Sequence, residues 1–194
     1  MNIANKLTLT RIGLTFVFMF FLFLPGLIFK SLALSIFCLA CLSDYLDGFL
    51  ARRHNVISNF GIIMDPIADK ILVLASFLSF VEMKLIPAWM VVIVILREFL
   101  ITGLRIFALS KGRALKAERA GKHKTMSQMF TIFVILLFLI VKEIGLKYAL
   151  WNDLIQSRAI AFITLLMMLT VIFTATSGIS FLLGNRHLIL RDNT

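Results

Sequence analysis

Four aspartates with helical spacing lie in the most apolar part of the chain and could bind divalent metal ions. They are Asp44, Asp47, Asp65 and Asp69, four of the ten acidic residues in the sequence. A carboxylate at membrane depth costs about 2.5–3.5 kcal/mol on insertion scales, so four of them need compensating charge. Such oxygen ligands suit Mg²⁺ or Mn²⁺, and paired ions can stabilise both oxygens of a phosphoryl displacement. The residues therefore predict two divalent cations, Mg²⁺ or Mn²⁺.

Small residues share the two helix faces that carry the carboxylates, because positions three, four and seven apart align on a helix. The first face comprises Asp44, Asp47, Gly48 and Ala51. The second face comprises Gly61, Asp65 and Asp69. The small residues leave room for a phosphate or a flat group, although close helix packing is the alternative. Arg52 could bind a diphosphate bidentately or could simply flank a membrane span. Pro66 disfavours a regular helix at Asp65.

Six apolar segments must position these residues, because a membrane-spanning helix needs about 20 apolar residues. Hydrophobic residues make up 60% of the chain, against about 45–50% in soluble domains. The expected spans are Arg11–Phe29, Leu32–Ala51, Phe60–Phe80, Pro87–Leu109, Met126–Ile144 and Ala159–Leu183. Pro25-Gly26 is expected to bend or end the first span. The fold class is thus an all-α integral membrane bundle of six transmembrane helices. It forms a single membrane domain over 1–194, with a juxtamembrane segment 1–10, helices within 11–183 and a tail 184–194.

Lys and Arg are distributed unevenly between the two sides of this expected bundle. Twelve lie on the side of the termini, three lie within spans, and five lie on the other side: Lys30, Lys84, Lys142, Lys147 and Arg158. The positive-inside rule therefore places both termini and the aspartates on the cytoplasmic side of the cell's inner membrane. The same rule accounts for the net charge of +10, and no nucleic-acid motif is recognisable, so a nucleic-acid partner is not expected. Cys38 and Cys41 lie in an apolar stretch and are interpreted as packing residues rather than a metal or redox pair.

Cationic residues in the fourth segment and before the fifth could bind an anionic substrate. Arg97 and Arg105 lie inside an expected span, where a charge is costly. Lys122 and Lys124 lie at the cytoplasmic mouth of the fifth span. Phosphate binding is favoured for Arg105 and the two lysines, whereas for Arg97 a structural ion pair with its neighbour stays open. The polar stretch Ser110–Lys124 is either a solvated loop or an anion-binding arm.

The aspartate motif reads D-x-x-D-G-x-x-A-R, eight residues, then G-x-x-x-D-x-x-x-D, which resembles the signature of the CDP-alcohol phosphotransferase family. The resemblance implies six transmembrane helices, a homodimer and a dinuclear metal site. It also implies transfer of a substituted phosphate from a CDP-linked donor to an alcohol, with release of CMP. The four aspartates would then be metal ligands, and Asp69 would also deprotonate the acceptor. The positions implied to contact the donor are Asn5, Leu7, Thr8, Asp44, Gly48, Ala51, Arg52, Ser58 and Gly61.

Further segments resemble the phosphatidylglycerophosphate synthases within that family, and the resemblance covers about residues 2–129. They are Arg97-Glu98-Phe99, Gly103-Leu104-Arg105 and residues 121–129. This implies CDP-diacylglycerol as donor, glycerol 3-phosphate as acceptor and membrane lipids as surroundings. The implied acceptor-phosphate ligands are Arg97, Arg105, Lys122 and Lys124. Another acceptor remains an alternative, as in cardiolipin, phosphatidylinositol-phosphate or phosphatidylserine synthases. A cation transporter is the alternative of another class, and a catalytically silent lipid-binding protein is a third.

Overall fold

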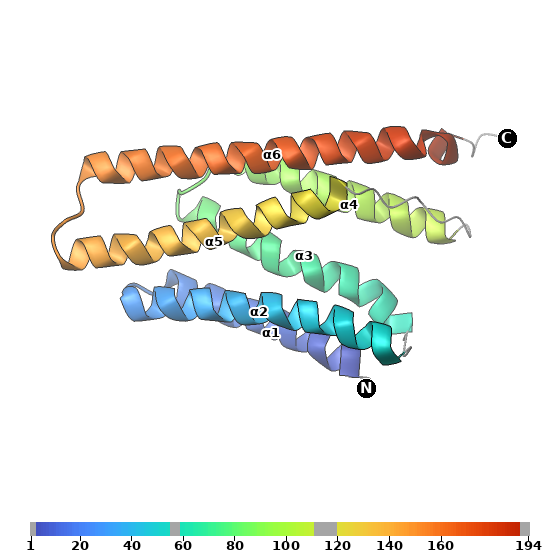
Figure 1. The fold of residues 1–194 in the computed structure, drawn as a ribbon, viewed down its shortest axis with the longest axis horizontal. Coiled ribbons are helices and arrows are strands. Elements are labelled where there is room, and N and C mark those ends of the chain that lie inside the picture. The colour runs from blue at the N-terminus through green and yellow to red at the C-terminus, as the bar shows by residue number, and fades with distance from the viewer. Residues whose placement is uncertain (1–2, 55–58, 111–119, 191–194) are drawn as a thin grey trace.

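Six α-helices make up the part of the chain that the computed structural model describes, residues 3–54, 59–110 and 120–190 (Figure 1). In chain order they are α1 (Ile3–Phe23), α2 (Leu27–His54), α3 (Asn59–Glu82), α4 (Ala88–Ser110), α5 (Ala120–Lys147) and α6 (Asp153–Leu190). Within these helices, the side chains of residues 3–8, 44–54, 59–69, 109, 120–123 and 186–190 lie outside the description. The all-α class is confirmed, since the described ranges contain no strand.

The first expected span, Arg11–Phe29, is wrong at its end because it crosses a break between two helices. Helix α1 stops at Phe23 and α2 begins only at Leu27. Pro25 has no backbone N–H to continue the helix. Gly26 has a φ of 109°, a left-handed value that glycine adopts without strain. The expectation that this proline-glycine pair bends or ends the first helix is therefore confirmed.

Helix α3 corrects a second expectation, because it continues through Asp65 and Pro66 without interruption. A proline within a helix removes one backbone hydrogen bond and crowds the carbonyl four residues earlier. The rest of α3 is firmly packed, with Phe77 and Phe80 fully buried. The helix therefore forms despite the local preference of the residue before proline, and the buried later part of α3 anchors it to its neighbours.

The helices pack so that one end of the bundle collects the segments that carry the predicted site. Helix α1 lies against α2 and α3, α5 contacts both α2 and α3, and α6 packs on α4 and α5 (Figure 1). The starts of α1, α3 and α5 and the ends of α2, α4 and α6 point the same way, to the right in Figure 1. We call this the site end. Each predicted site residue that belongs to a described helix lies either in the half of that helix nearer the site end or close to the middle of the helix.

Close packing and buried hydroxyl groups hold the helices together. Phe18 and Phe77 are fully buried in the core shared by α1, α2 and α3, and Met167 is fully buried on α6. The hydroxyl oxygens of Thr131 and Thr170 lie 2.8 Å apart and join α5 to α6 by a hydrogen bond. Contacts of these kinds drive helix association where lipid tails surround the protein, because lipid is as apolar as leucine.

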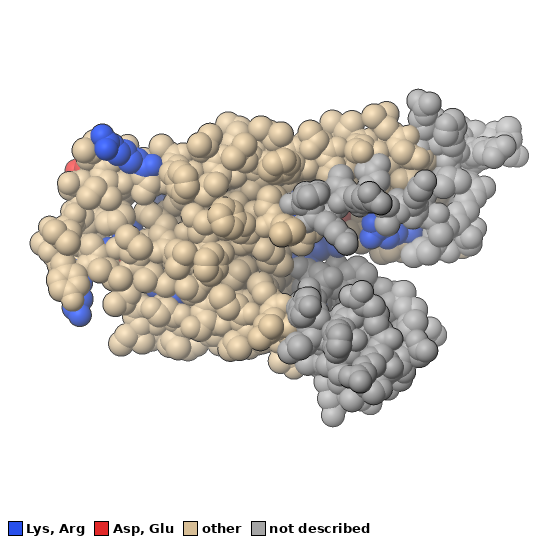
Figure 2. Space-filling model, viewed as in Figure 1, with Lys and Arg blue, Asp and Glu red and all other residues tan. Residues whose placement is uncertain are grey.

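The outer surface is apolar along the middle of the bundle. Phe16 is 66% exposed and Ile28 is 72% exposed, and many other large apolar side chains face outward. Figure 2 shows Lys and Arg toward the two ends of the visible face, with a largely uncharged belt between them. Two described segments, Lys124–Lys147 and Asp153–Asn185, are long and apolar enough to cross a membrane. These features indicate a membrane protein, and the six spans stay a prediction.

The turn between α5 and α6 depends on the absence of a side chain at Gly145. A Cβ there would lie 2.7 Å from Cε3 of Trp151. The indole is fixed, since its Nε1 donates to Gln156 Oε1 over 3.2 Å and its ring packs 5.8 Å from that of Phe138. We expect Gly145→Ala to lower the free energy of unfolding by about 1–3 kcal/mol, because a rigid ring must move. Gly13→Ala is the matched control.

The control carries the same gain in helix propensity without the clash, because nothing lies within 4 Å of a Cβ on Gly13. Thermal unfolding of the two purified variants, followed by circular dichroism, measures the difference. The Tm of Gly145→Ala should fall below that of Gly13→Ala. Equal Tm values would show that Trp151 does not constrain this turn.

Candidate active site

The aspartate motif lies on two helices that are consecutive in the chain. Asp44 and Asp47 belong to the second half of α2, and Asp65 and Asp69 to the first half of α3. Four residues connect these helices, and a connection of that length spans at most about 18 Å, so the two helix ends stay close. The aspartate side chains lie outside the described residues, and their mutual geometry stays a prediction. By ligand chemistry, two pairs of carboxylates fit two divalent cations.

Side chains elsewhere in the described part of the chain offer no competing metal centre. No group of three or more His, Cys, Asp or Glu among them could hold a metal ion. The four aspartates are not included, because their side chains are not described. The aspartate motif stays a predicted metal centre.

The predicted donor-binding residues lie on three helices at the site end. Helix α1 carries Asn5, Leu7 and Thr8 in its first two turns, while α2 carries Gly48, Ala51 and Arg52 near its end. Gly61 lies in the first turn of α3, and Ser58 lies outside the described residues. Because α1 packs against both α2 and α3, these segments share one region of the bundle. Their side-chain contacts stay predictions.

A buried group of charges joins α4 to the start of α5. Glu98 and Lys124 are 6% and 5% exposed, and their side chains form an ion pair. Arg97 Nη1 lies 3.4 Å from the same carboxylate oxygen, Oε1 of Glu98. Gln128, one turn along α5, donates from Nε2 to that oxygen over 3.4 Å. We call these four residues the Glu98 cluster.

Helix α6 fixes the other side of Arg97. Its Nη2 donates to Ser177 Oγ over 2.9 Å. A Cβ on the next residue, Gly178, would lie 3.1 Å from Arg97 Cγ, so α6 closely approaches the stem of the arginine. Arg97 is thus held between the carboxylate of Glu98 and the backbone of α6. These contacts match the ion-pair alternative for Arg97, and a phosphate-binding role stays a prediction.

The structure brings only part of the predicted acceptor-phosphate set together. Arg97 and Lys124 meet at Glu98, whereas Arg105 lies eight residues further along α4, about 12 Å away along the helix. The guanidinium carbon of Arg105 lies 6.0 Å from the centre of the Phe181 ring, at the outer limit of a cation–π contact. Lys122 belongs to the first turn of α5, but its side chain is outside the description.

Lys70 connects the Glu98 cluster to the aspartate motif. It directly follows Asp69 on α3 and is half-buried. Both Lys70 and Arg97 lie within electrostatic range of Lys124. Helix α3 also packs against α5, which carries Lys124. Arg97 and Lys124 therefore meet at Glu98, and Lys70, the residue after Asp69, adds a third positive charge within electrostatic range of Lys124, so a dianion would be attracted to this region.

The sequence indicates the ion pair of Arg97 with Glu98 as an alternative, but it does not indicate the contact of Arg97 with Ser177 or that of Gln128 with Glu98. An acid inside an apolar span is itself a signal of function, and Glu98 is such a residue. Gln128 lies within a segment of resemblance that implies no role for this residue. Ser177 and Gly178 lie in a segment that is only generically apolar, so no pattern distinguishes them.

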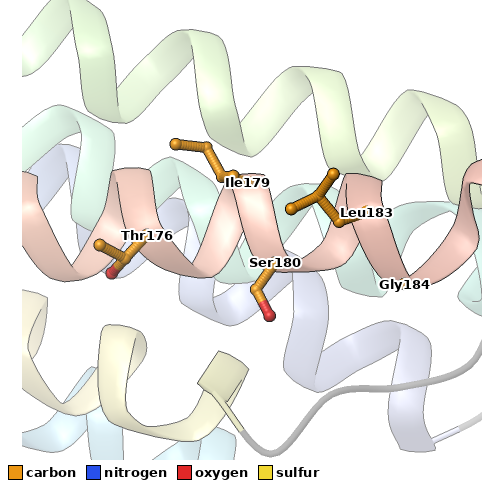
Figure 3. A pocket seen from close by; sticks show the side chains of 5 residues that line it. All are labelled: Thr176, Ile179, Ser180, Leu183 and Gly184. Atoms are coloured by element: carbon orange, nitrogen blue, oxygen red, sulfur yellow. The ribbon is translucent and has the colours of Figure 1, made fainter.

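An open groove of about 440 Å³ lies along the outer face of α6 (Figure 3). Its lining consists of Thr176, Ile179, Ser180, Leu183 and Gly184. In Figure 3, Ile179 and Leu183 point to one side of the helix, and Thr176 and Ser180 to the other. Ser177, which binds Arg97, is buried and does not line the groove. The lining includes none of the predicted site residues.

Comparison with known proteins gives a consistent set of relatives. A family model described as CDP-alcohol phosphatidyltransferase matches residues 1–180. A CDP-diacylglycerol–glycerol-3-phosphate 3-phosphatidyltransferase of Bacillus subtilis (strain 168) is 33% identical, and the alignment covers 99% of each chain. A protein of the same name from Rickettsia typhi is 32% identical over 70% of this chain and 76% of its own. A probable phosphatidylglycerophosphate synthase of Mycobacterium tuberculosis is 36% identical over 68% of this chain and 64% of its own.

Proposed function

The chain belongs to the CDP-alcohol phosphatidyltransferase family, and on that premise we propose that it transfers the phosphatidyl group of CDP-diacylglycerol to glycerol 3-phosphate. The products are phosphatidylglycerophosphate and CMP, which makes the protein a membrane transferase of phospholipid biosynthesis. The observation that carries this conclusion is the alignment with the Bacillus relative over 99% of both chains. The complete aspartate motif agrees with the chemistry.

The proposed metal ligands are Asp44, Asp47, Asp65 and Asp69. Their oxygens are the ligand type that Mg²⁺ and Mn²⁺ prefer, and two divalent cations balance four carboxylates. When bound, the cations supply positive charge beside the phosphate oxygens on which negative charge develops. The surrounding residues are proposed to bind the donor. Among them, Arg52 is proposed to bind the diphosphate, because a guanidinium can donate two parallel hydrogen bonds to it. The other donor contacts proposed are Asn5, Leu7, Thr8, Asp44, Gly48, Ala51, Ser58 and Gly61.

Asp69 is the proposed general base as well as a metal ligand. Its carboxylate takes the proton from the primary hydroxyl of glycerol 3-phosphate. The oxygen of that hydroxyl then attacks the β-phosphorus of the donor. The bond from this phosphorus to the CMP oxygen breaks, so the phosphatidyl group passes directly to the acceptor. The acyl chains of the donor remain in the bilayer throughout.

Arg97, Arg105, Lys122 and Lys124 are the proposed ligands of the acceptor phosphate. The meeting of Arg97 and Lys124 at one buried point supports this role for these two. Lys70 is within electrostatic range of Lys124 and is the neighbour of the proposed base, so a phosphate bound there lies near the reacting hydroxyl. Arg105 is exposed, belongs to the half of α4 nearer the site end, and would attract the acceptor from solution.

The proposed location is the cytoplasmic membrane, crossed six times by one membrane domain over 1–194. Both termini and the active site lie on the cytoplasmic side, where soluble glycerol 3-phosphate is available. The excess of Lys and Arg on that side supports the orientation. We also propose a homodimer, which rests on the family resemblance.

An acceptor panel tests the proposed function. Purified protein receives CDP-diacylglycerol with Mg²⁺ or Mn²⁺ and one of four acceptors: glycerol 3-phosphate, inositol phosphate, serine or phosphatidylglycerol. We expect CMP release to be at least about tenfold faster with glycerol 3-phosphate, because contacts to a charged phosphate are lost with an acceptor that lacks it or holds it elsewhere. Faster turnover with another acceptor would reassign the substrate. Cation flux into liposomes without CMP release would favour a transporter.

A further inference from the structure

Three donors from two helices converge on one oxygen of Glu98. Lys124 pairs with Oε1, and Arg97 Nη1 and Gln128 Nε2 each lie 3.4 Å from the same atom. Glu98 itself is 6% exposed, so the carboxylate is shielded from water. A shared acceptor of this kind sets the distance between the groups that bind it. The positions of Arg97 and Lys124 relative to each other therefore depend on Glu98.

Physical chemistry explains why the two cations need such an anchor. Like charges repel strongly where the dielectric constant is low, and both side chains have long flexible stems. Hydrogen bonds to an ionised partner are about twice as strong as neutral ones, so the carboxylate can hold both groups against this repulsion. A glutamine in place of Glu98 would have the same shape and could still accept a hydrogen bond, but it would carry no negative charge to offset the repulsion.

Helix α6 restricts the guanidinium of Arg97 further through contacts with Ser177 and Gly178. Ser177 Oγ accepts from Arg97 Nη2 at 2.9 Å, while Gly178 lets the helix backbone approach the arginine stem. Lys124 of the Glu98 cluster is within electrostatic range of Lys70, and Lys70 directly follows the proposed base Asp69 in the sequence.

We propose that Glu98 is a positioning residue that holds Arg97 and Lys124 side by side for the phosphate of the acceptor, with Ser177 as a second support for Arg97. This rests on the proposed function. Glu98 does not touch the substrate in this role and acts only through the two cations. Its removal should weaken acceptor binding more than donor binding.

The test compares Michaelis constants for the two substrates in purified variants. For Glu98→Gln we expect the KM for glycerol 3-phosphate to rise about tenfold, with the KM for CDP-diacylglycerol unchanged, because only charge-assisted contacts are lost. Glu98→Asp keeps the charge and should recover part of the effect. Ser177→Ala should raise the same KM about threefold, since it loses one hydrogen bond. Thr131→Val is the control.

The control removes a buried hydrogen bond between α5 and α6, the one to Thr170, without touching the Glu98 cluster. It should leave both KM values near those of the wild type. A KM for glycerol 3-phosphate that is unchanged or lower in Glu98→Gln would overturn the proposal, as would an equal change for both substrates. If Glu98→Gln fails to fold, an unchanged KM in Ser177→Ala would overturn it.

Binding of inorganic phosphate separates this inference from the proposed function. If the wild type does not release CMP with glycerol 3-phosphate, the proposed function fails. The rise in Tm on adding inorganic phosphate then reports anion binding without turnover. A smaller rise in Glu98→Gln than in the wild type and in Thr131→Val supports the positioning role. Equal rises in all three proteins contradict it.

Discussion

Replacing Asp69 by asparagine is expected to abolish CMP release while the helical fold remains. General-base catalysis alone contributes about 10²–10⁴ in rate, and Asp69 is also proposed to bind metal, so a loss of at least about 10³-fold is expected. Asparagine has nearly the shape of aspartate but cannot take the proton. CMP release is measured by chromatography and helix content by circular dichroism.

Asp153→Asn is the matched control for this substitution. Asp153 is exposed at the first residue of α6, at the end of the bundle away from the site end. The same chemical change there should leave turnover near that of the wild type. Near-normal CMP release by Asp69→Asn would show that another group deprotonates the acceptor.

Removal of divalent cations is expected to have the second large effect. Chelation should reduce CMP release to background, and added Mg²⁺ or Mn²⁺ should restore it, because four carboxylates without cations repel both one another and an anionic donor. Binding to the folded state also stabilises the protein, by about 2.7 kcal/mol for a site at a concentration of 100 times its Kd. The Tm should therefore rise on adding Mn²⁺.

A variant separates this metal effect from a general effect of salt. Asp47→Asn should lose most of the rise in Tm with Mn²⁺, whereas Asp153→Asn should retain it. This readout does not depend on turnover. Full activity in excess chelator, or the same Tm rise in both variants, would show that the aspartate motif does not bind the cations.

The helices were predictable because long apolar runs specify them, and their breaks follow from local chemistry. Pro25-Gly26 ends α1 as its residues indicate. Pro66 does not interrupt α3, because the preference of a single residue is weak beside the packing of the later part of the helix, where Phe77 and Phe80 are buried. Length and composition determine the number of helices. The position along each helix at which it contacts its neighbours depends instead on packing throughout the bundle.

The candidate site has one part that local spacing predicts and another that depends on packing between distant segments. The aspartates follow from spacing within two neighbouring helices, a local property of the sequence. The meeting of Lys124 with Glu98 depends instead on the start of α5 lying beside the middle of α4. Ser177 approaches Arg97 from 80 positions along the chain, and no periodicity reports a contact at that separation.

Transfer of an isotopic label tests the central claim most directly. Glycerol 3-phosphate labelled with ¹⁸O in its primary hydroxyl is incubated with CDP-diacylglycerol, Mg²⁺ or Mn²⁺ and purified protein, and the products are analysed by mass spectrometry. Direct attack by that hydroxyl predicts labelled phosphatidylglycerophosphate and an equal amount of unlabelled CMP. Unlabelled phosphatidylglycerophosphate, or phosphatidic acid formed in its place, would contradict the transfer proposed for this chain.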